Sequence, residues 1–347
     1  MKKHEGFRIF EYAIFLAVML GTAVLCVCAG SVSIPVKDTL AAIRSAVSHL
    51  PMPEGVAASI ILSVRLPRVL AVALTGASLS LCGAAMQGLL RNPLADGSTL
   101  GVSSGASLGA VLAIALGLAI PGIPLAGTMV MAMLFAFLSL LLILFLAYKL
   151  DPALSTNTII LVGIVFSMFC NSLVSLFTVF AADRVRSILF WMMGSLSGSD
   201  YTDVLVLGGA LTVCGTAIVR FSRELNAFSV GEDNARHVGV NVKRVRLLVL
   251  VFVSVLIGVC VAIGGTIGFV GLVMPHMTRL IVGPNHRRLL PSVLFFGATF
   301  LMLADLVGRV ILNPLELPIG VVTSLIGAAA FILIFFRSRA KGGELRA

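Results

Sequence analysis

The sequence predicts an all-α membrane protein, a single polytopic bundle of about ten transmembrane helices that extends over residues 1–347. Hydrophobic residues make up 59% of the chain and charged residues 12%, whereas a soluble domain is nearer half apolar and a quarter charged. The apolar residues occur in continuous runs rather than in alternation, which excludes a transmembrane β-barrel. Lipid is therefore the solvent expected for most of this chain.

Ten apolar runs account for the predicted bundle, since a helix needs about 20 mostly apolar residues to cross about 30 Å of hydrocarbon. Several runs are interrupted by Gly or Pro, and irregular backbone survives at membrane depth only inside the protein or beside a cavity. Basic residues precede the first run as in a signal peptide, but no clear cleavage site follows, and we interpret it as a retained helix. The runs begin near Phe10, Ile60, Leu100, Leu125, Thr158, Tyr201, Leu247, Thr266, Pro291 and Leu317.

The positive charges are divided unevenly between the predicted inner and outer loops. If the N-terminus is placed inside, 18 of the 25 Lys and Arg residues fall inside, and cytoplasmic loops carry such an excess. We therefore expect both termini in the cytoplasm, an orientation that accounts for the net charge of +10 without a nucleic-acid partner. The seven outer cations are Lys37, Arg44, Arg65, Arg68, Arg184, Arg186 and Arg309.

The sequence lacks the motifs of an enzyme that binds a nucleotide or a metal. Neither the phosphate loop GxxxxGK(S/T) nor the zinc motif HExxH occurs, and the spacing of residues reveals no nucleophile–base pair. We therefore expect no catalytic residue, metal or cofactor on this chain. The six cysteines lie inside apolar runs without a CxxC motif, and we interpret them as packing residues rather than disulfide partners.

Asp305 is the main candidate for an ionisable group that could couple transport to an ion gradient. It lies four residues before Arg309 on the same face of a predicted helix, so an intrahelical ion pair is the simpler interpretation. Ion-coupled transport is therefore disfavoured, and a transporter of this sequence needs another source of energy.

Small side chains dominate the second run and one face of the third. Gly76, Gly83 and many Ala and Ser residues predict that the second helix lies at the centre of the bundle, because small residues let helices approach closely. In the third run Gly101, Gly105 and Gly109 recur at four-residue spacing, and we interpret this stripe as a helix-packing face.

Two inner turns and one outer segment punctuate the bundle. In RNPLADGS, Pro93 ends a helix and Asp96-Gly97 supplies turn residues. In LDPALSTN, Ser155 is predicted to cap the helix that follows. The outer segment DRVRSILFWMMGSLSGSD holds Trp191 and predicts a short surface helix at the membrane interface.

Residues 221–246 form a charged cytoplasmic loop between two membrane-length runs. Residues 232–238 predict a short helix with acids in its first turn and Arg236 later, which matches the helix dipole. Gly231 interrupts the chain before this helix, and Gly239 ends it as a C′ residue does. A solvated connector is the simpler alternative, but a compact helix between two glycines suits contact with another protein.

At this loop the sequence resembles the permease subunits of bacterial ABC importers for iron–siderophores, haem and vitamin B12, the type II importers. The resemblance extends over essentially the whole chain, from the first span to Phe336. The blocks that carry it are RLPRVLAV, GAAMQGLLRNPLADGSTLGVSSGASLGA, LSTNTIILVG, FWMMGSL, GEDNARHVGV, GTIGFVGLVMPHMTRLIVGPNHRRLLP, LADLVGR and LELPIGVVTSLIGAAAFILI.

The resemblance implies a ten-helix subunit that pairs with a second copy or a close relative around a central path. It also implies two cytoplasmic ATPase subunits, which would hold the ATP and Mg, and an extracytoplasmic substrate-binding protein. The loop 221–246 resembles the segment that couples such permeases to the ATPase. The residues that we expect to make this contact are Gly231, Glu232, Ala235, Arg236 and Gly239.

Residues at both ends of the predicted bundle match other functional positions of the family. Three outer arginines match its docking arginines, and they could hold acidic groups of the binding protein in a bidentate way or reach lipid headgroups instead. The docking arginines are Arg65, Arg68 and Arg309, and the residues that match the cytoplasmic gate are Asn92, Leu94, Thr156 and Asn157. The substrate path is expected along the second, fifth and tenth helices.

We therefore expect a permease in a bacterial cell membrane that carries a ferric siderophore or similar iron chelate inward, with ATP hydrolysed on another chain. Haem and cobalamin stay open as cargoes, because the external binding protein selects the ligand. A membrane scaffold or sensor that transports nothing is the alternative from a different class. The identity of the second permease chain and the anchoring of the binding protein also stay open.

Overall fold

The regular structure is helical throughout the residues that the computed structural model describes, apart from an isolated bridge between Leu312 and Leu315. The described residues are 9–30, 56–118 and 126–343, with scattered positions between 35 and 48. Most of the predicted outer loop 31–59 lies outside them, as do Lys2, Lys3, Arg8 and Arg346. The all-α prediction is confirmed.

Seven described segments are long and apolar enough to cross a membrane, and three shorter apolar helices complete a set that matches the ten predicted runs. Two long segments contain a π-helical turn, at Ile61–Arg65 before α4 and at Leu211–Gly215 between α9 and α10. The long segments are α1 (Ile9–Cys28), α3 with α4 (Val56–Ile60 and Leu66–Leu90), α6 (Ala126–Leu150), α7 (Thr156–Phe180), α9 with α10 (Tyr201–Ala210 and Thr216–Arg220), α13 (Val242–Gly264) and α15 (His286–Val310). The shorter apolar helices are α5 (Val102–Leu116), α14 (Val270–Val282) and the part Ile319–Leu333 of α16 (Ile319–Gly343).

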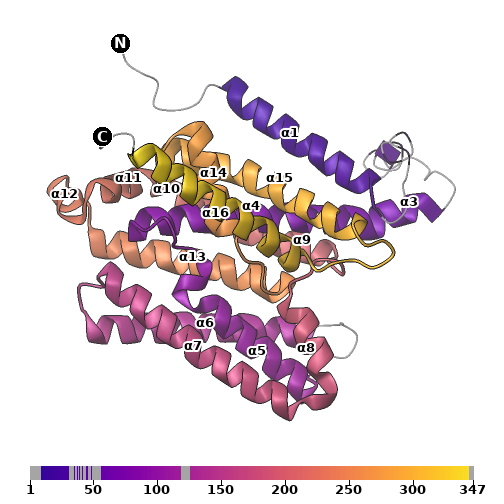
Figure 1. Cartoon of the computed structure of the whole chain (residues 1–347), viewed down its shortest axis with the longest axis horizontal. Helices are drawn as coiled ribbons and strands as arrows, with labels where there is room; N and C mark the ends of the chain where they lie inside the picture. Colours follow the sequence, from indigo (N-terminus) through magenta and orange to yellow (C-terminus); the bar gives the residue numbers. More distant parts are fainter. Residues whose placement is uncertain are drawn as a thin grey trace.

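Helix α4 runs through the middle of the molecule, as its small side chains predicted (Figure 1). It packs against α13, α14 and α15, while α5, α6 and α7 form a group at one side and α1 lies along the other. The segment that contains α4 is 83% buried within its apolar window, whereas the windows of α6 and α7 are 28% buried. The outer helices therefore present apolar side chains to lipid or to a partner.

Glycines set how closely the central helices approach. A Cβ built on Gly83 of α4 would lie 1.8 Å from the Gly271 carbonyl oxygen of α14, and one on Gly76 would lie 2.3 Å from the Gly297 oxygen of α15. In α5, a Cβ on Gly105 would lie 1.7 Å from Ser139 Oγ of α6. The packing interpretation of the small-residue stripe is therefore confirmed at Gly105.

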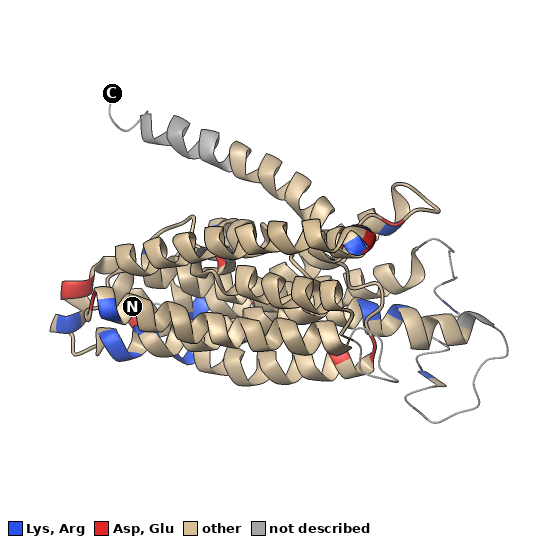
Figure 2. Ribbon diagram, turned by 90° about the horizontal axis from the view of Figure 1, so that it is seen from below, with Lys and Arg blue, Asp and Glu red and all other residues tan. Residues whose placement is uncertain are grey.

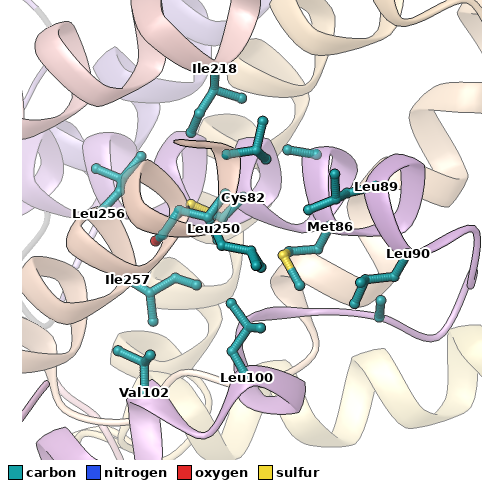
Figure 3. Packing of buried hydrophobic residues seen from close by; sticks show 14 of the residues in the cluster. Cys82, Met86, Leu89, Leu90, Leu100, Val102, Ile218, Leu250, Leu256 and Ile257 are labelled. Atoms are coloured by element: carbon teal, nitrogen blue, oxygen red, sulfur yellow. Dashed lines mark hydrogen bonds between the residues drawn. The ribbon is translucent and has the colours of Figure 1, made fainter. Parts of the chain in front are cut away.

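The largest hydrophobic cluster joins α4 to α13 and to the start of α5. Figure 3 shows Met86 and Leu90 of α4 facing Leu250 and Ile257 of α13, with Leu100 below them. All five side chains are buried to within a few per cent of complete. This cluster fixes α13, and with it the charged loop that precedes α13, to the centre of the bundle.

Helices α5 and α14 are each preceded by a non-α-helical segment that is part of the bundle. Residues 91–101 connect α4 to α5, and residues 265–269 connect α13 to α14. Gly265 (φ +68) and Phe269 (φ +66) adopt positive φ in the second connection. The irregular backbone expected where Gly interrupts an apolar run is present here.

Charged residues lie mostly toward the two ends of the bundle, as Figure 2 shows. One end carries α11 (Ser222–Val230) and α12 (Glu232–His237) together with the start of α1. The other end carries the arginines near the start of α4 and α8 (Val185–Met192), the predicted surface helix that holds Trp191. We call these the α12 end and the α8 end.

Candidate functional site

The helix predicted in the charged loop is present, as α12. It is bounded by Gly231 (φ +143) and by Gly239 (φ +85). The Gly239 N–H donates a hydrogen bond to the Arg236 carbonyl oxygen at 2.9 Å, which closes the helix. The amide of Val240 also donates to the Ala235 oxygen at 3.0 Å, so a left-handed glycine cap ends α12 as predicted.

The outer surface of α12 combines charge with exposed apolar groups. Val230 and Val238, on either side of the helix, are 68% and 73% exposed, and the side chains of Asp233 and Arg236 are 88% and 56% exposed. We call these four residues the α12 surface. Ala235 is completely buried and cannot contact a partner directly, so that part of the predicted contact is wrong: its methyl group packs α12 onto the bundle.

Arg246, in the first part of α13, is a buried cation that the sequence analysis counted only as an inner positive charge. Its side chain is fully buried, and its Nη2 forms an ion pair with Glu232 of α12. Its Nη1 donates to the Leu154 oxygen at 2.5 Å and to the Ala153 oxygen at 3.4 Å, in the turn between α6 and α7. The sequence signal for this role is weak, because it consists of one cation at the start of an apolar run.

Asp151 organises the inner turn between α6 and α7. Its carboxylate accepts hydrogen bonds from the amides of Ser155 (2.8 Å) and Ala153 (2.9 Å). Ser155 stands at the N-cap position but makes no capping bond, so its predicted role is wrong, and its hydroxyl lies 3.0 Å from Thr158 Oγ1 instead. The bonds from the Ser155 side chain and amide, and from Ala153, lower the pKa of Asp151 to about 2.

The four predicted gate residues lie in two turns at the α12 end. Asn92 Oδ1 accepts a bond from the Leu94 amide at 2.9 Å, which folds the first turn, and Leu94 is 52% exposed. Thr156 and the exposed Asn157 open α7, directly after the turn that Arg246 holds. Their gating role stays a prediction.

The predicted docking arginines are buried rather than directed outward, and their docking role stays a prediction. Arg65, Arg68 and Arg309 are 7%, 8% and 3% exposed. The Arg68 guanidinium pairs with two carboxylates, Asp305 at 2.9 Å and Glu316 at 2.8 Å. Arg309 pairs with Asp305 at 3.0 Å, so the predicted intrahelical ion pair is confirmed.

Two of these arginines also hold the end of α1. Arg65 donates to the oxygens of Val27 (2.8 Å) and Cys28 (3.0 Å). Arg309 donates to the oxygens of Cys26 (3.0 Å) and Ala29 (3.1 Å). Carbonyls at a helix C-terminus lack intrahelical partners and form the negative end of its dipole, so guanidinium groups stabilise them. The arginines have a structural role that sequence alone did not indicate.

A cavity of about 510 Å³ lies among α4, α5, α7, α13 and the irregular segment before α14. Polar groups from α5 and α7 meet apolar side chains there, so the cavity can accept a mixed polar and apolar molecule. The predicted path helices α4 and α7 contribute, while α16 is absent among its described lining residues. Polar lining residues include Asp96, Ser103, Ser104, Ser107, Asn171 and Thr266.

The described helices form a multi-pass membrane bundle that encloses a cavity, and these features define the chain as a polytopic membrane protein. The profile of the FecCD transport family matches residues 16–337, and the chain belongs to this family. It is the permease of an ABC importer, a multi-pass membrane component and not an enzyme, since such systems hydrolyse ATP on a separate subunit.

Curated relatives cover nearly the whole chain. It is 40% identical to the uncharacterized ABC transporter permease protein YvrB of Bacillus subtilis, over 95% of this chain and 94% of that one. It is 37% identical to the vitamin B12 import system permease protein BtuC of Klebsiella pneumoniae (94% and 93%). It is also 37% identical to the hemin transport system permease protein HmuU of Yersinia pestis (80% and 83%).

A solved structure shares the fold as well as the sequence. The chain superposes with a TM-score of 0.82 on a structure presented as an inward-facing conformation of a metal-chelate type ABC transporter. The two are 33% identical, and the match covers 93% of this chain and 97% of that one. The predicted type II importer permease fold is therefore confirmed.

Proposed function

We propose that this chain forms the membrane path of an importer that carries a ferric siderophore or a similar iron chelate into a bacterial cell. Two copies, or this chain and a close relative, enclose the path. Two ATPase subunits with their ATP and Mg bind on the cytoplasmic side, and a substrate-binding protein docks outside. Haem and cobalamin are the alternative cargoes, because the relatives named for hemin and for vitamin B12 are equally similar, at 37% identity.

The observation that carries the proposal is the α12 surface, a charged patch on a helix mounted rigidly at one end of the bundle. Exposed valines beside exposed charges suit a protein contact, in which apolar area gives affinity and charge gives orientation. The start of α1 and the course of α16 lead to the same end (Figure 1). The proposal therefore puts α12, the ATPase and both termini in the cytoplasm.

The outer face around Glu316 receives the binding protein in this proposal. Three buried arginines meet two carboxylates there, which leaves one positive charge in excess and favours an acidic partner. Glu316 is the accessible member of the cluster, since its side chain is 37% exposed. Arg65, Arg68 and Arg309 act from beneath this surface, and Asn92, Leu94, Thr156 and Asn157 close the path at the other end.

Substrate uptake tests the proposal directly. A strain that lacks the gene, and the same strain complemented, are offered labelled ferric hydroxamate, ferric catecholate, haem and cobalamin in turn. Loss and recovery of one chelate alone identifies the cargo. Uptake of all four without change, together with failure of any ATPase to co-purify with the chain, would support a scaffold or sensor instead.

The coupling assignment has its own test. Asp233→Lys with Val238→Asp, on the exposed surface, should abolish co-purification of the ATPase without loss of folded permease. Arg186→Gln, which removes an exposed charge at the opposite end, is the matched control. Undiminished co-purification of the double variant contradicts the assignment of α12 as the ATPase contact.

A further inference from the structure

Arg246 is the largest fully buried side chain among the described residues. It lies at the meeting point of three elements: its own helix α13, the helix α12, and the turn between α6 and α7. A buried guanidinium is costly unless its donors are bonded, and an unpaired one destabilises a protein strongly. The position is therefore defined by its partners, Glu232 on one side and Leu154 on the other.

The two partners are held by the same rigid group. A guanidinium is planar and its donors have a fixed geometry, so Nη1 and Nη2 cannot move independently. Nη2 pairs with Glu232, whose side chain is only 28% exposed beneath the α12 surface. Nη1 donates to the carbonyl of Leu154, a residue held in left-handed backbone (φ +53) with a buried side chain. A displacement of α12 therefore reaches the turn through one side chain.

The turn that Arg246 holds leads directly into α7. Leu154 is followed by Ser155, and α7 begins at Thr156 with Asn157 exposed beside it. Asp151 stiffens the same turn through its bonds to the amides of Ala153 and Ser155. The turn is thus a compact unit that moves as a whole when one of its carbonyls is pulled. Helix α7 in turn contributes Asn171 to the cavity.

We propose that Arg246 is a positioning residue that transmits the movement of α12 to the start of α7, and so couples ATP hydrolysis to the opening of the path. The proposal rests on the assignment of α12 as the ATPase contact and of the α7 start as the gate. In this proposal Glu232 does not contact the ATPase; it passes the movement of α12 to Arg246. Arg246 then passes that movement to the α6–α7 turn through the Leu154 carbonyl.

The neighbouring cations provide matched controls. Arg244, two residues earlier on α13, is exposed and carries the same charge. Lys243 connects α13 to α6 by a different contact: its Nζ lies 4.6 Å from the centre of the Tyr148 ring of α6. Neither residue joins α12 to the α6–α7 turn in the described contacts, so neither should affect coupling.

The test uses the whole complex with its ATPase and binding protein, reconstituted in liposomes, with uptake and ATP hydrolysis measured on the same sample. Arg246→Met, which fills the space without the donors, should lower the substrate carried per ATP hydrolysed by about tenfold, with hydrolysis itself little changed. Arg246→Lys keeps the charge but cannot bond both partners. Its substrate carried per ATP should lie between that of Arg246→Met and that of the unmodified protein. Arg244→Gln and Lys243→Gln should equal the unmodified protein.

The opposite side of the link gives an independent variant. Glu232→Ala lies outside the membrane spans and should reduce substrate carried per ATP as Arg246→Met does. The two changes combined should be no worse than either alone, because they break one link. Unchanged substrate per ATP in Arg246→Met overturns the proposal, and if that variant does not fold, the same result in Glu232→Ala overturns it.

Failure of the underlying function is distinguishable from failure of this link. If α12 does not contact the ATPase, Asp233→Lys with Val238→Asp leaves ATPase co-purification intact, whatever Arg246 does. If the link alone fails, that double variant still loses the ATPase while Arg246→Met transports with normal substrate per ATP.

Discussion

Asp305 sets the charge balance of a buried cluster at the α8 end of the bundle. Its two oxygens serve different partners, Oδ1 pairing with Arg68 and Oδ2 with Arg309. The side chain of Asp305 is 3% exposed, and those of the two arginines are 10% and 4% exposed, so water can replace none of these contacts without rearrangement. The residue is explained by structure, and ion coupling need not be invoked for it.

Removal of this carboxylate should therefore destabilise the chain strongly. Asp305→Ala leaves two guanidinium groups buried without their shared partner, and we expect a loss of about 3–5 kcal/mol. Glu316→Ala is the control, since its side chain is 37% exposed and exposed pairs contribute about 0–1 kcal/mol. Thermal unfolding of the purified permease in detergent measures both, and equal losses would contradict the distinction.

Gly83 is the residue at which a single methyl group should matter most. An added Cβ would lie 1.8 Å from the Gly271 oxygen and 2.5 Å from its carbonyl carbon, so α4 and α14 must separate. We expect Gly83→Ala to cost about 1–3 kcal/mol or more. Gly209→Ala, where nothing lies within 4 Å, should be neutral or slightly stabilising. Unfolding temperatures of the two variants test this, and similar values would refute the packing argument.

At the scale of elements, the sequence predicted what depends on local pattern. Apolar runs located seven helices long enough to span a membrane and three shorter apolar helices, and Gly231 and Gly239 located both ends of α12. Contacts between distant segments were beyond this reasoning. Arg65 and Arg309 meet carbonyls of α1, and Arg246 meets Leu154, 92 residues away. Charge and spacing predict a cation at a helix end, but they do not predict which backbone carbonyl oxygen it will bond.

The cap of Ser155 failed because its hydroxyl has another partner. The hydroxyl lies 3.0 Å from Thr158 Oγ1 and bonds none of the amides at the start of α7, while the amide of Ser155 itself donates to Asp151. The sequence shows an acceptor at the helix start, but not which neighbouring hydroxyl it meets.

The end of α12 depends on one glycine conformation. Nothing lies within 4 Å of a Cβ built on Gly239, so a substitution meets only the cost of φ +85. We expect Gly239→Ala to destabilise the end of α12 by about 1–2 kcal/mol and to weaken ATPase binding several-fold. Gly239→Asn, which tolerates left-handed backbone, should retain most of the affinity. Titration of the ATPase against permease in nanodiscs distinguishes them, and equal affinities would argue against a structural role of the cap.

At the scale of the whole molecule, the charged residues divide between two ends of the bundle, and the proposed orientation rests on this division. The α12 end carries the charged loop and both inner turns, and the α8 end carries the arginine cluster (Figures 1 and 2). All six cysteines are buried, so they give little background for labelling with a thiol reagent. The orientation can therefore be tested with single introduced cysteines.

Val238→Cys should react with a membrane-impermeant maleimide in inside-out vesicles and be protected in intact spheroplasts. Leu315→Cys, which is 71% exposed at the other end, should show the reverse. The unmodified chain, treated in the same way, gives the background. Labelling of both positions from one side would contradict the predicted topology, which places the α12 end and the α8 end on opposite sides of the membrane.

The hydrogen bonds from Arg65 and Arg309 to the carbonyls of α1 have a consequence for the order in which this protein is assembled. Helix α1 precedes the other described helices in the chain, and only 11% of its apolar window is buried against the rest of the chain. The arginine that holds Cys26 is 283 residues further along and belongs to a much later helix. Until α15 is synthesised, the carbonyls at the C-terminal end of α1 lack the Arg309 donor. A helix made early is thus fixed in place by a residue made late.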